Sequence, residues 1–149
     1  MRAFCKQYDT PVEAIITECG VFEPVELNAG QKKPNGRRVS NAMWDTGSTD
    51  TLISSNIVKE LHLQPIDTVK IGAVDGEVEA KVYKIHLVLP NNLVFPNLAV
   101  IETQSEDYDV IIGMDIISAT DFALTLPDGR SKFTFEFPSK RDIDFTKEN

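Results

Sequence analysis

The chain has 149 residues, 42% of them hydrophobic, and a formal net charge of −8. This length fits one domain with a substantial core, and the absence of low-complexity tracts predicts an ordered globular protein. Because the acidic residues are distributed along the chain, binding to nucleic acid or to anionic membranes is disfavoured.

The chain has one cluster of basic residues, which is interrupted by Pro34, Asn35 and Gly36. We interpret it as a solvated loop, and a nucleic-acid patch is the less favoured interpretation. Its members are Lys32, Lys33, Arg37 and Arg38.

The N-terminus has no apolar run of signal-peptide length, and no segment approaches the roughly 20 apolar residues that span a bilayer. Cys5 and Cys19 allow at most one disulfide and resemble neither a disulfide framework nor a metal site. We therefore expect a cytoplasmic protein with two reduced thiols and no membrane partner.

Strand-like patterns dominate the first part of the chain. Two apolar-rich runs, 12–18 and 21–27, are separated by Cys19-Gly20, which predicts a hairpin. A polar loop at 28–36 leads into a strand at 37–44. Ser54 or Ser55 is then expected to cap a short helix that continues to Leu61 and ends before Pro65.

The segment 66–89 predicts a hairpin that projects from the body of the protein. Residues 72–76 form its turn. Beyond the turn Val78, Ala80 and Val82 alternate with polar residues, but from Tyr83 onward the apolar set is shifted by one position. Such a shift moves the buried side to the other face, so it indicates a bulge or a strand that passes from one packing environment into another.

The rest of the chain continues this strand-rich pattern. We expect a turn at 90–92, strands near 93–101 and 110–113, a short helix at 114–119, a strand at 122–126, a turn at 127–129 and a last strand with Phe133, Phe135 and Phe137 on one face. Residues 139–149 are expected to form a flexible tail. The predicted architecture is all-β with two short helices, in a single domain (1–149) with its core at about 12–138.

The sequence Asp45-Thr46-Gly47-Ser48 carries the most informative chemistry, because it directly follows an apolar strand. An aspartate in that place lies at the edge of the core, where its ionisation can be tuned. Gly47 lets a backbone N–H approach the carboxylate, and the neighbouring hydroxyls can donate hydrogen bonds. Alone, the tripeptide is weak evidence, since an Asx turn at a strand end has the same letters.

A second signature lies at 109–115, where Ile112 and Gly113 precede a short helix and allow a strand to pack tightly behind another loop. With a glycine-bearing hairpin between the two motifs, the chain resembles the retropepsin-type aspartic proteases, the family of retroviral proteases and their cellular and bacterial relatives. The similarity extends from about Val39 to Phe137.

The resemblance implies a retropepsin-like acid-protease β-barrel domain with one flap hairpin per subunit, acting as a homodimer. It implies catalysis by Asp45, and a grip on the partner subunit's matching loop by Thr46. It also implies support of the catalytic loop by Gly47 and Ser48 and packing behind that loop by Ile112 and Gly113. The resemblance also implies that the flap that covers substrate is formed by Gly72, Ala73, Val74, Asp75 and Gly76.

The chain departs from many retroviral members at two positions. Those members have an arginine directly after the downstream glycine, paired with an acid beside the catalytic loop. This chain has Met114 and Thr49 in those places. Because both partners are missing together, no charge is left unpaired. Asp50 and Asp115 are expected to form local caps and not to be catalytic.

The implied mechanism needs two carboxylates that share one proton. The ionised one draws a proton from water, and the protonated one donates to the carbonyl oxygen of the substrate. The chain has one such motif, so a second copy across a two-fold axis must supply the other. We therefore predict an aspartic endopeptidase that acts on peptide or protein substrates without metal or cofactor.

The hydroxyl of Ser48 is expected to donate to Asp45, which favours the ionised carboxylate. The activity optimum should then be more acidic than that of Ser48→Ala.

The main alternative is a catalytically silent homodimer of the same fold that binds peptides in its groove. Its mark would be a change at Asp45, Thr46 or Gly47, and none is changed. A metalloenzyme is disfavoured because His62 and His86 lie far apart and have no partner at ligand spacing. A serine hydrolase is disfavoured because no Gly-x-Ser-x-Gly elbow is present.

Overall fold

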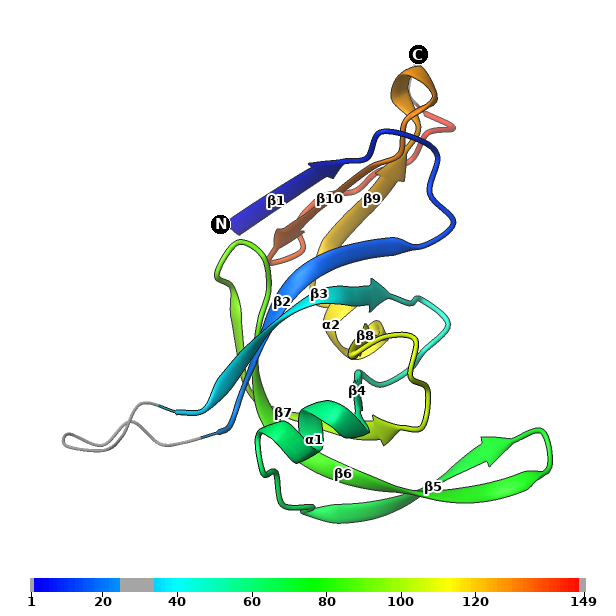
Figure 1. The fold of residues 1–149 in the computed structure, drawn as a ribbon. Coiled ribbons are helices and arrows are strands. Elements are labelled where there is room, and N and C mark those ends of the chain that lie inside the picture. The colour runs from blue at the N-terminus through cyan, green and yellow to red at the C-terminus, as the bar shows by residue number, and fades with distance from the viewer. Residues whose placement is uncertain (1, 25–33, 148–149) are drawn as a thin grey trace.

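The computed structural model describes residues 2–24 and 34–147, and these form two β-sheets with two short α-helices (Figure 1). The predicted all-β architecture is confirmed. In chain order the elements are β1 (Arg2–Gln7), β2 (Ile15–Phe22), β3 (Gly36–Trp44), β4 (Leu52–Ser54), α1 (Ser55–Glu60), β5 (Asp67–Ala73), β6 (Gly76–Val88), β7 (Val94–Thr103), β8 (Val110–Ile112), α2 (Met114–Ile117), β9 (Asp121–Thr125), the 3-10 turn η1 (Pro127–Gly129) and β10 (Lys132–Phe137).

The larger sheet is a closed barrel with one strand added outside it. Its order is β2-β3-β8-β4-β7-β6-β5, and β2 also pairs with β6, which closes the first six strands into a ring. Strand β5 pairs with β6 and stays outside the ring. Strand β8 runs parallel to β3, with Trp44 opposite Ile112. The ends of β3 and β8 therefore meet at one place, where the two sequence motifs begin their loops.

The smaller sheet has the order β1-β10-β9 and is antiparallel throughout. Phe133 and Phe135 of β10 are fully buried and pack against Trp44, with ring centroids 5.0 and 5.1 Å apart. Such aromatic contacts contribute about 1 kcal/mol each beyond the area they bury. This sheet therefore holds the residue that directly precedes Asp45.

The predicted projecting hairpin is formed by β5 and β6. The two strands pair from Asp67 opposite Val82 to Ala73 opposite Gly76, and Gly76 has a φ of 122°, which favours glycine at the turn. The shift of the apolar set at Val82 marks a change of packing partners: Ala80 and Val82 pack with Ile101 in a small cluster, whereas the strand beyond them enters the main core. The register irregularity with β7 lies further along, between Ile85 and Leu87.

The two predicted helices are present. The hydroxyl of Ser54 accepts a hydrogen bond from the Ile57 N–H at 3.3 Å and so caps α1, whose Ile57 and Val58 face the core. Helix α2 starts at Met114, directly after Gly113. No helix of residues 2–24 and 34–147 is long and apolar enough to cross a membrane.

The predicted hairpin at Cys19-Gly20 is wrong, because β2 passes through both residues without a turn. Cys19 and Val21 are buried in this strand, and its pairing with β3 has an irregularity between Thr17 and Cys19. A Cβ on Gly20 would lie 2.8 Å from a ring carbon of Phe22, so this glycine serves close packing. The end of the second predicted arm (25–27), most of the predicted loop (28–33) and two members of the basic cluster, Lys32 and Lys33, lie outside the described residues.

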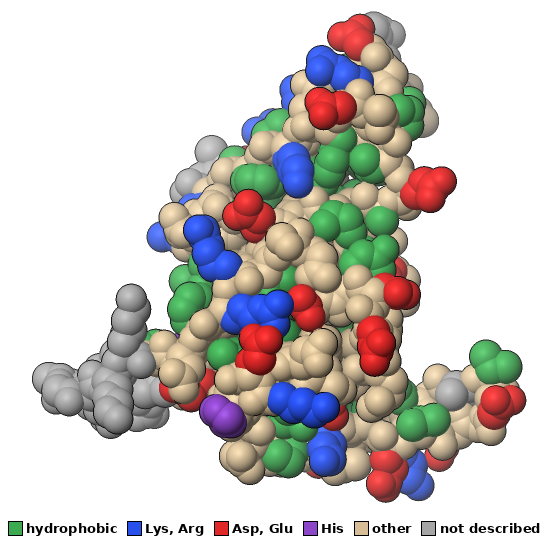
Figure 2. Space-filling model, viewed as in Figure 1, with side chains coloured by type: hydrophobic (Ala, Val, Ile, Leu, Met, Phe, Trp, Pro, Cys, Tyr) green, Lys and Arg blue, Asp and Glu red, His purple; other side chains and the backbone are tan. Residues whose placement is uncertain are grey.

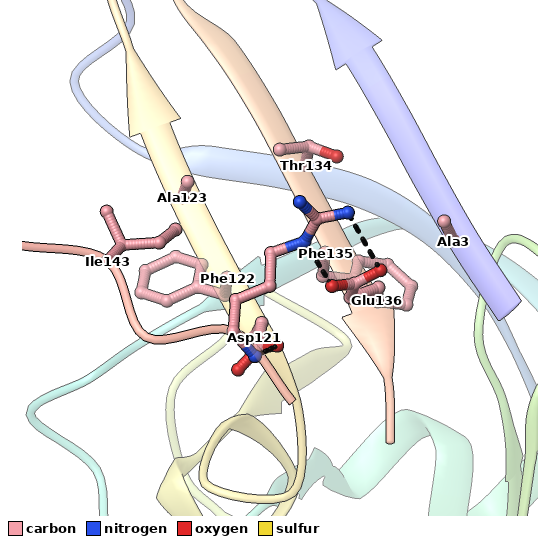
Figure 3. A pocket seen from close by; sticks show the side chains of 9 residues that line it. Ala3, Asp121, Phe122, Ala123, Thr134, Phe135, Glu136 and Ile143 are labelled. Atoms are coloured by element: carbon pink, nitrogen blue, oxygen red, sulfur yellow. Dashed lines mark hydrogen bonds and ion pairs between the residues drawn. The ribbon is translucent and has the colours of Figure 1, made fainter. Parts of the chain in front are cut away.

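The segment after β10 folds back onto the start of β9. The carboxylate of Asp121 accepts hydrogen bonds from the Ser139 hydroxyl at 2.6 Å and from the Lys140 and Arg141 N–H groups at 2.7 Å each. Arg141 also pairs with the buried carboxylate of Glu136, as Figure 3 shows. The division into a core at 12–138 and a flexible tail stays a prediction.

Candidate active site

Asp45 is the first residue after β3, and its backbone is fixed on both sides. Its N–H donates to the carbonyl oxygen of Ile112 at 2.9 Å, across the junction of β3 and β8. The preceding Trp44 is buried, and its indole N–H donates to the Thr17 hydroxyl at 2.9 Å. The Asp45 side chain is half-buried at the surface above this junction.

A tight turn orients the carboxylate. The Gly47 N–H donates to Asp45 Oδ1 at 2.8 Å, and the Ser48 N–H donates to the Asp45 carbonyl oxygen at 3.1 Å. A Cβ on Gly47 would lie 3.1 Å from that Oδ1, closer than side chains ordinarily approach. Gly47 therefore lets the backbone N–H of the loop approach the Asp45 carboxylate closely. Thr46, the residue expected to contact a partner subunit, is exposed.

The Ser48 hydroxyl does not make the predicted hydrogen bond to Asp45. It donates instead to the carbonyl oxygen of Asp50 at 2.7 Å. A hydroxyl has one proton to donate, so in this conformation Ser48 stabilises the turn and not the charge of Asp45.

The turn that contains Gly113 packs directly behind residues 45–51, which we call the catalytic loop after the role predicted for Asp45. The Met114 N–H donates to the Ser48 carbonyl oxygen at 2.7 Å, and the Asp115 N–H donates to that of Thr49 at 3.1 Å. A Cβ on Gly113 would lie only 2.4 Å from the Asp50 carbonyl oxygen. Glycine is therefore required here by close approach. Met114 and Thr49 occupy the places at which many retroviral members have an ion pair. Here each of the two residues instead makes a backbone hydrogen bond to the neighbour of the other.

Asp115 links the two loops through its side chain, a contact that sequence reasoning did not predict. Its carboxylate accepts from the Thr51 hydroxyl at 2.7 Å, from the Thr51 N–H at 3.0 Å and from the Ile116 N–H at 2.9 Å. The Thr51 hydroxyl in turn accepts from the Gly113 N–H at 3.2 Å. Because Thr51 is fully buried, these bonds replace lost hydration and fix the far end of the catalytic loop.

A hollow of about 370 Å³ lies beside Asp45. Its walls come from the segment between β1 and β2 and the first residue of β2, from the end of β3 and from Leu124 on β9, a combination that no sequence motif indicates. Leu124 is 49% exposed although β9 is otherwise part of a packed sheet. The residues that line the hollow with Asp45 are Val12, Glu13, Ala14, Ile15, Met43, Trp44 and Leu124.

The flap residues are at the far end of the β5–β6 hairpin, which Figure 1 shows projecting from the barrel. Val74 is fully exposed, and Gly72 and Gly76 have no neighbouring atom within 4 Å of an added Cβ. None of the flap residues whose side chains the structure describes (72 and 74–76) lines the hollow beside Asp45. The structure thus brings Asp45, Gly47, Ile112 and Gly113 together and leaves the flap turn apart from them.

A second hollow, of about 260 Å³, lies on the smaller sheet under the C-terminal segment (Figure 3). None of the predicted site residues lines it. Glu136 is paired with Arg141, and Asp121 accepts from residues 139–141. Since the carboxylates at its wall already have partners, we assign no site there.

Neither the metal-ligand residues nor the thiols form a second reactive centre in the part of the chain that the structure describes. No group of three or more His, Cys, Asp or Glu residues there is arranged to hold a metal ion. Both cysteines are free; Cys5 is exposed, whereas burial, with a smaller effect of the Asp109 charge, raises the pKa of Cys19 to about 12. Thiolate chemistry at Cys19 is therefore disfavoured at neutral pH.

Comparison with known families identifies the class of protein that this fold and loop define. The model of the family described as "gag-polyprotein putative aspartyl protease" matches residues 31–119, more than half of the chain. The chain belongs to this family.

The fold is shared with a solved structure, the crystal structure of a retropepsin-like aspartic protease from Rickettsia conorii. The two superpose with a TM-score of 0.52 at 10% sequence identity, over 89% of this chain and 91% of that chain. A comparison with curated protein sequences finds no match. The chain is therefore a retropepsin-like domain of the aspartic protease class.

Proposed function

We propose that this chain is one subunit of a homodimeric aspartic endopeptidase, in which two copies of Asp45 activate a water molecule between them. The observation that carries the proposal is the fixed carboxylate: Asp45 is held by the Ile112 carbonyl and the Gly47 N–H, and its surface opens into a hollow large enough for a side chain. Each chain has one such motif, so the pair of carboxylates requires two chains.

The mechanism follows from the chemistry of two facing carboxylates. Held a few ångströms apart, they retain one proton between them, because two like charges at that distance repel strongly. The ionised carboxylate takes a proton from the water as it attacks the peptide carbonyl, and the protonated one donates to the developing oxyanion. The hydrogen bond from Gly47 keeps Oδ1 in a fixed orientation, which leaves the rest of the carboxylate for the partner and the water.

Strand β9 supports a two-fold interface beside Asp45. Among the described residues no strand pairs with the edge of β9 that faces away from β10. The same strand and the residue that follows it expose Leu124 and Leu126, by 49% and 57%. An unpaired edge with exposed leucines is a site at which a second sheet can add. Because Leu124 lines the hollow at Asp45, an interface here would bring two such hollows close to one axis.

The test of activity uses the full chain and a denatured protein substrate over a range of acidic to neutral pH. Wild type is expected to produce new peptide fragments, and Asp45→Ala is expected to produce none. Fragments that form equally with both proteins would show that Asp45 is not catalytic. Peptide binding without cleavage by the wild type would instead support the silent dimer.

The test of the shared site uses subunit mixing. Wild-type and Asp45→Ala subunits are unfolded together in equal amounts and refolded, so that about a quarter of the dimers contain two wild-type subunits. We expect the activity of the mixture to be about a quarter, and not one half, of the activity of the same total amount of wild-type protein. Activity proportional to the amount of wild-type subunit would show that one Asp45 suffices.

The proposed interface is tested by Leu126→Arg, which should shift the protein toward monomer in analytical ultracentrifugation and reduce activity at low protein concentration. Val94→Arg is the matched control, because Val94 is 47% exposed and lies against Arg2 and Pro138, away from Asp45. An unchanged dimer in Leu126→Arg would place the interface elsewhere.

A further inference from the structure

Two segments that meet at the hollow beside Asp45 are acidic. These are the loop between β1 and β2 (8–14) and the catalytic loop (45–51). Together they contain no Lys or Arg, although the chain has 15 such residues. Their acidic residues are Asp9, Glu13, Asp45 and Asp50.

The space-filling view shows the same asymmetry. In Figure 1 these loops lie along the right-hand edge, between the smaller sheet and the flap. Along that edge in Figure 2, between the smaller sheet and the flap, the visible charged side chains are red, and the blue ones lie elsewhere on this face. Among the described residues none of these four carboxylates is in an ion pair. The two loops therefore form a negatively charged rim beside the hollow.

The hollow beside Asp45 combines this rim with apolar walls. Among the described residues, Glu13 is the one charged residue besides Asp45 that lines it, and Glu13 is exposed. The remaining walls are apolar, and include Ala14, Ile15 and Leu124. A hollow of this kind matches a long side chain with an apolar stem and a cationic head, because such side chains bury the stem and keep the charge at the water boundary.

We propose that this hollow receives a lysine or arginine side chain of the substrate, with Glu13 as its carboxylate partner, so that the enzyme cleaves basic peptide segments. This inference rests on the proposed function and names its substrate class. The apolar walls contact the aliphatic stem, and Glu13 pairs with the ammonium or guanidinium group. The acidic rim also attracts basic peptides before they bind, which raises the association rate at low salt.

The experiment uses a set of peptides that are identical except at one position, which carries norleucine, lysine, arginine or glutamate. Each position around the cleaved bond is varied in turn. Norleucine and lysine have similar aliphatic stems, so their comparison isolates the charge. At one position the kcat/KM for lysine or arginine is expected to exceed that for norleucine by about three- to tenfold, as an accessible charge pair allows, and the ratio should fall as salt is raised.

Two variants separate the hollow from the overall charge. Glu13→Gln is expected to lower the lysine-to-norleucine ratio about threefold or more. Glu18→Gln removes the same charge from an exposed residue that lines a different hollow, and it should leave the ratio unchanged. Equal kcat/KM values for the lysine and norleucine peptides in the wild type would overturn the proposal. Equal effects of the two variants on the lysine-to-norleucine ratio would also overturn it.

Binding of the same peptides to Asp45→Asn, measured by fluorescence anisotropy, separates this inference from the proposed function. A preference for lysine that depends on Glu13 in binding, with no cleavage by the wild type, would refute the protease and retain the basic-peptide site. Cleavage that depends on Asp45 but ranks norleucine first would retain the protease and refute the site.

Discussion

The catalytic loop at 45–51 and the flap turn at 72–76 are held in different ways. The loop is bonded to the β8–α2 turn along most of its length, at Asp45, Ser48, Thr49 and Thr51. The flap turn is bonded through the pairing of β5 with β6, and its apex residue Val74 is fully exposed. A catalytic group needs a fixed position, whereas a cover must open for substrate, so the two kinds of support match the two proposed roles.

The largest difference between the two regions is expected when a glycine in each is replaced by alanine. Gly113→Ala places a Cβ 2.4 Å from the Asp50 carbonyl oxygen, so the catalytic loop must shift, and we expect loss of about 1–3 kcal/mol of unfolding free energy together with most of the activity. Gly72→Ala meets no atom within 4 Å and should change stability by less than about 0.5 kcal/mol. Thermal unfolding and peptide cleavage measure both effects.

Equal losses of stability and activity in Gly113→Ala and Gly72→Ala would contradict this difference between loop and flap. They would show that the loop accommodates a side chain as easily as the flap does. A stable Gly113→Ala protein with full activity would show that the β8–α2 turn does not position Asp45.

The next largest difference is expected between two aspartates. Asp115→Ala leaves the buried Thr51 N–H and hydroxyl without their acceptor, which should cost about 2 kcal/mol of unfolding free energy and lower kcat more than it raises KM. Asp75→Ala at the exposed flap turn should leave stability unchanged within about 0.5 kcal/mol. Chemical denaturation and steady-state kinetics provide the measurements.

Asp115→Asn is the informative intermediate, because it keeps one acceptor oxygen and removes the other. It should recover part of the stability and part of kcat. Recovery of stability without recovery of kcat would show that Asp115 supports the fold and does not position the catalytic loop.

The contrast between loop and flap also explains what the sequence could predict. The local features were accessible: a helix cap at Ser54 or Ser55, the approach of Gly47 to the Asp45 carboxylate and the shift at Val82 each depend on residues close together in the chain. The link from Asp115 to Thr51 joins positions 64 residues apart, and no single sequence indicates such a pair. Strand β1 was missed because its alternation is weak and its partner β10 is at the other end of the chain.

The misassigned Cys19-Gly20 hairpin has a similar cause. A glycine between apolar runs indicates a turn when it is read locally, but here it allows Phe22 to pack against the strand. The hollow beside Asp45 was also outside the reach of motif reasoning, because Leu124 and the 12–15 segment are brought to it by the pairing of β9 and β1 with β10 in the smaller sheet.

A third region sharpens the comparison through pH, because the C-terminal segment, like the catalytic loop, is held by a carboxylate. Hydrogen bonds from the Lys140 N–H, the Ser139 hydroxyl and the Arg141 N–H lower the pKa of Asp121. A lowered pKa means that the tie is fully present above the ordinary aspartate pKa and is lost as the pH falls through the lower, folded-state value. Hydrogen exchange at residues 139–141 should therefore accelerate in strong acid, and in Asp121→Asn it should be fast at neutral pH.

Asp128→Asn provides the control, since Asp128 is an exposed acid in the η1 turn of the same sheet. It should leave exchange at 139–141 as in the wild type at every pH. Slow exchange in Asp121→Asn at neutral pH would show that contacts other than the carboxylate hold the segment.

The smallest effect is expected at Ser48, inside the catalytic loop itself. From the sequence, its hydroxyl should favour the ionised form of Asp45 and make the activity optimum more acidic. In the structure the hydroxyl donates to the Asp50 carbonyl oxygen, so Ser48→Ala should give a pH–rate profile that superimposes on the wild type, with about 0.5–1 kcal/mol less stability from the lost hydrogen bond. A less acidic optimum in Ser48→Ala would show that the hydroxyl turns to Asp45 when two subunits meet, and then the catalytic loop would share with the flap the property of changing its contacts on assembly.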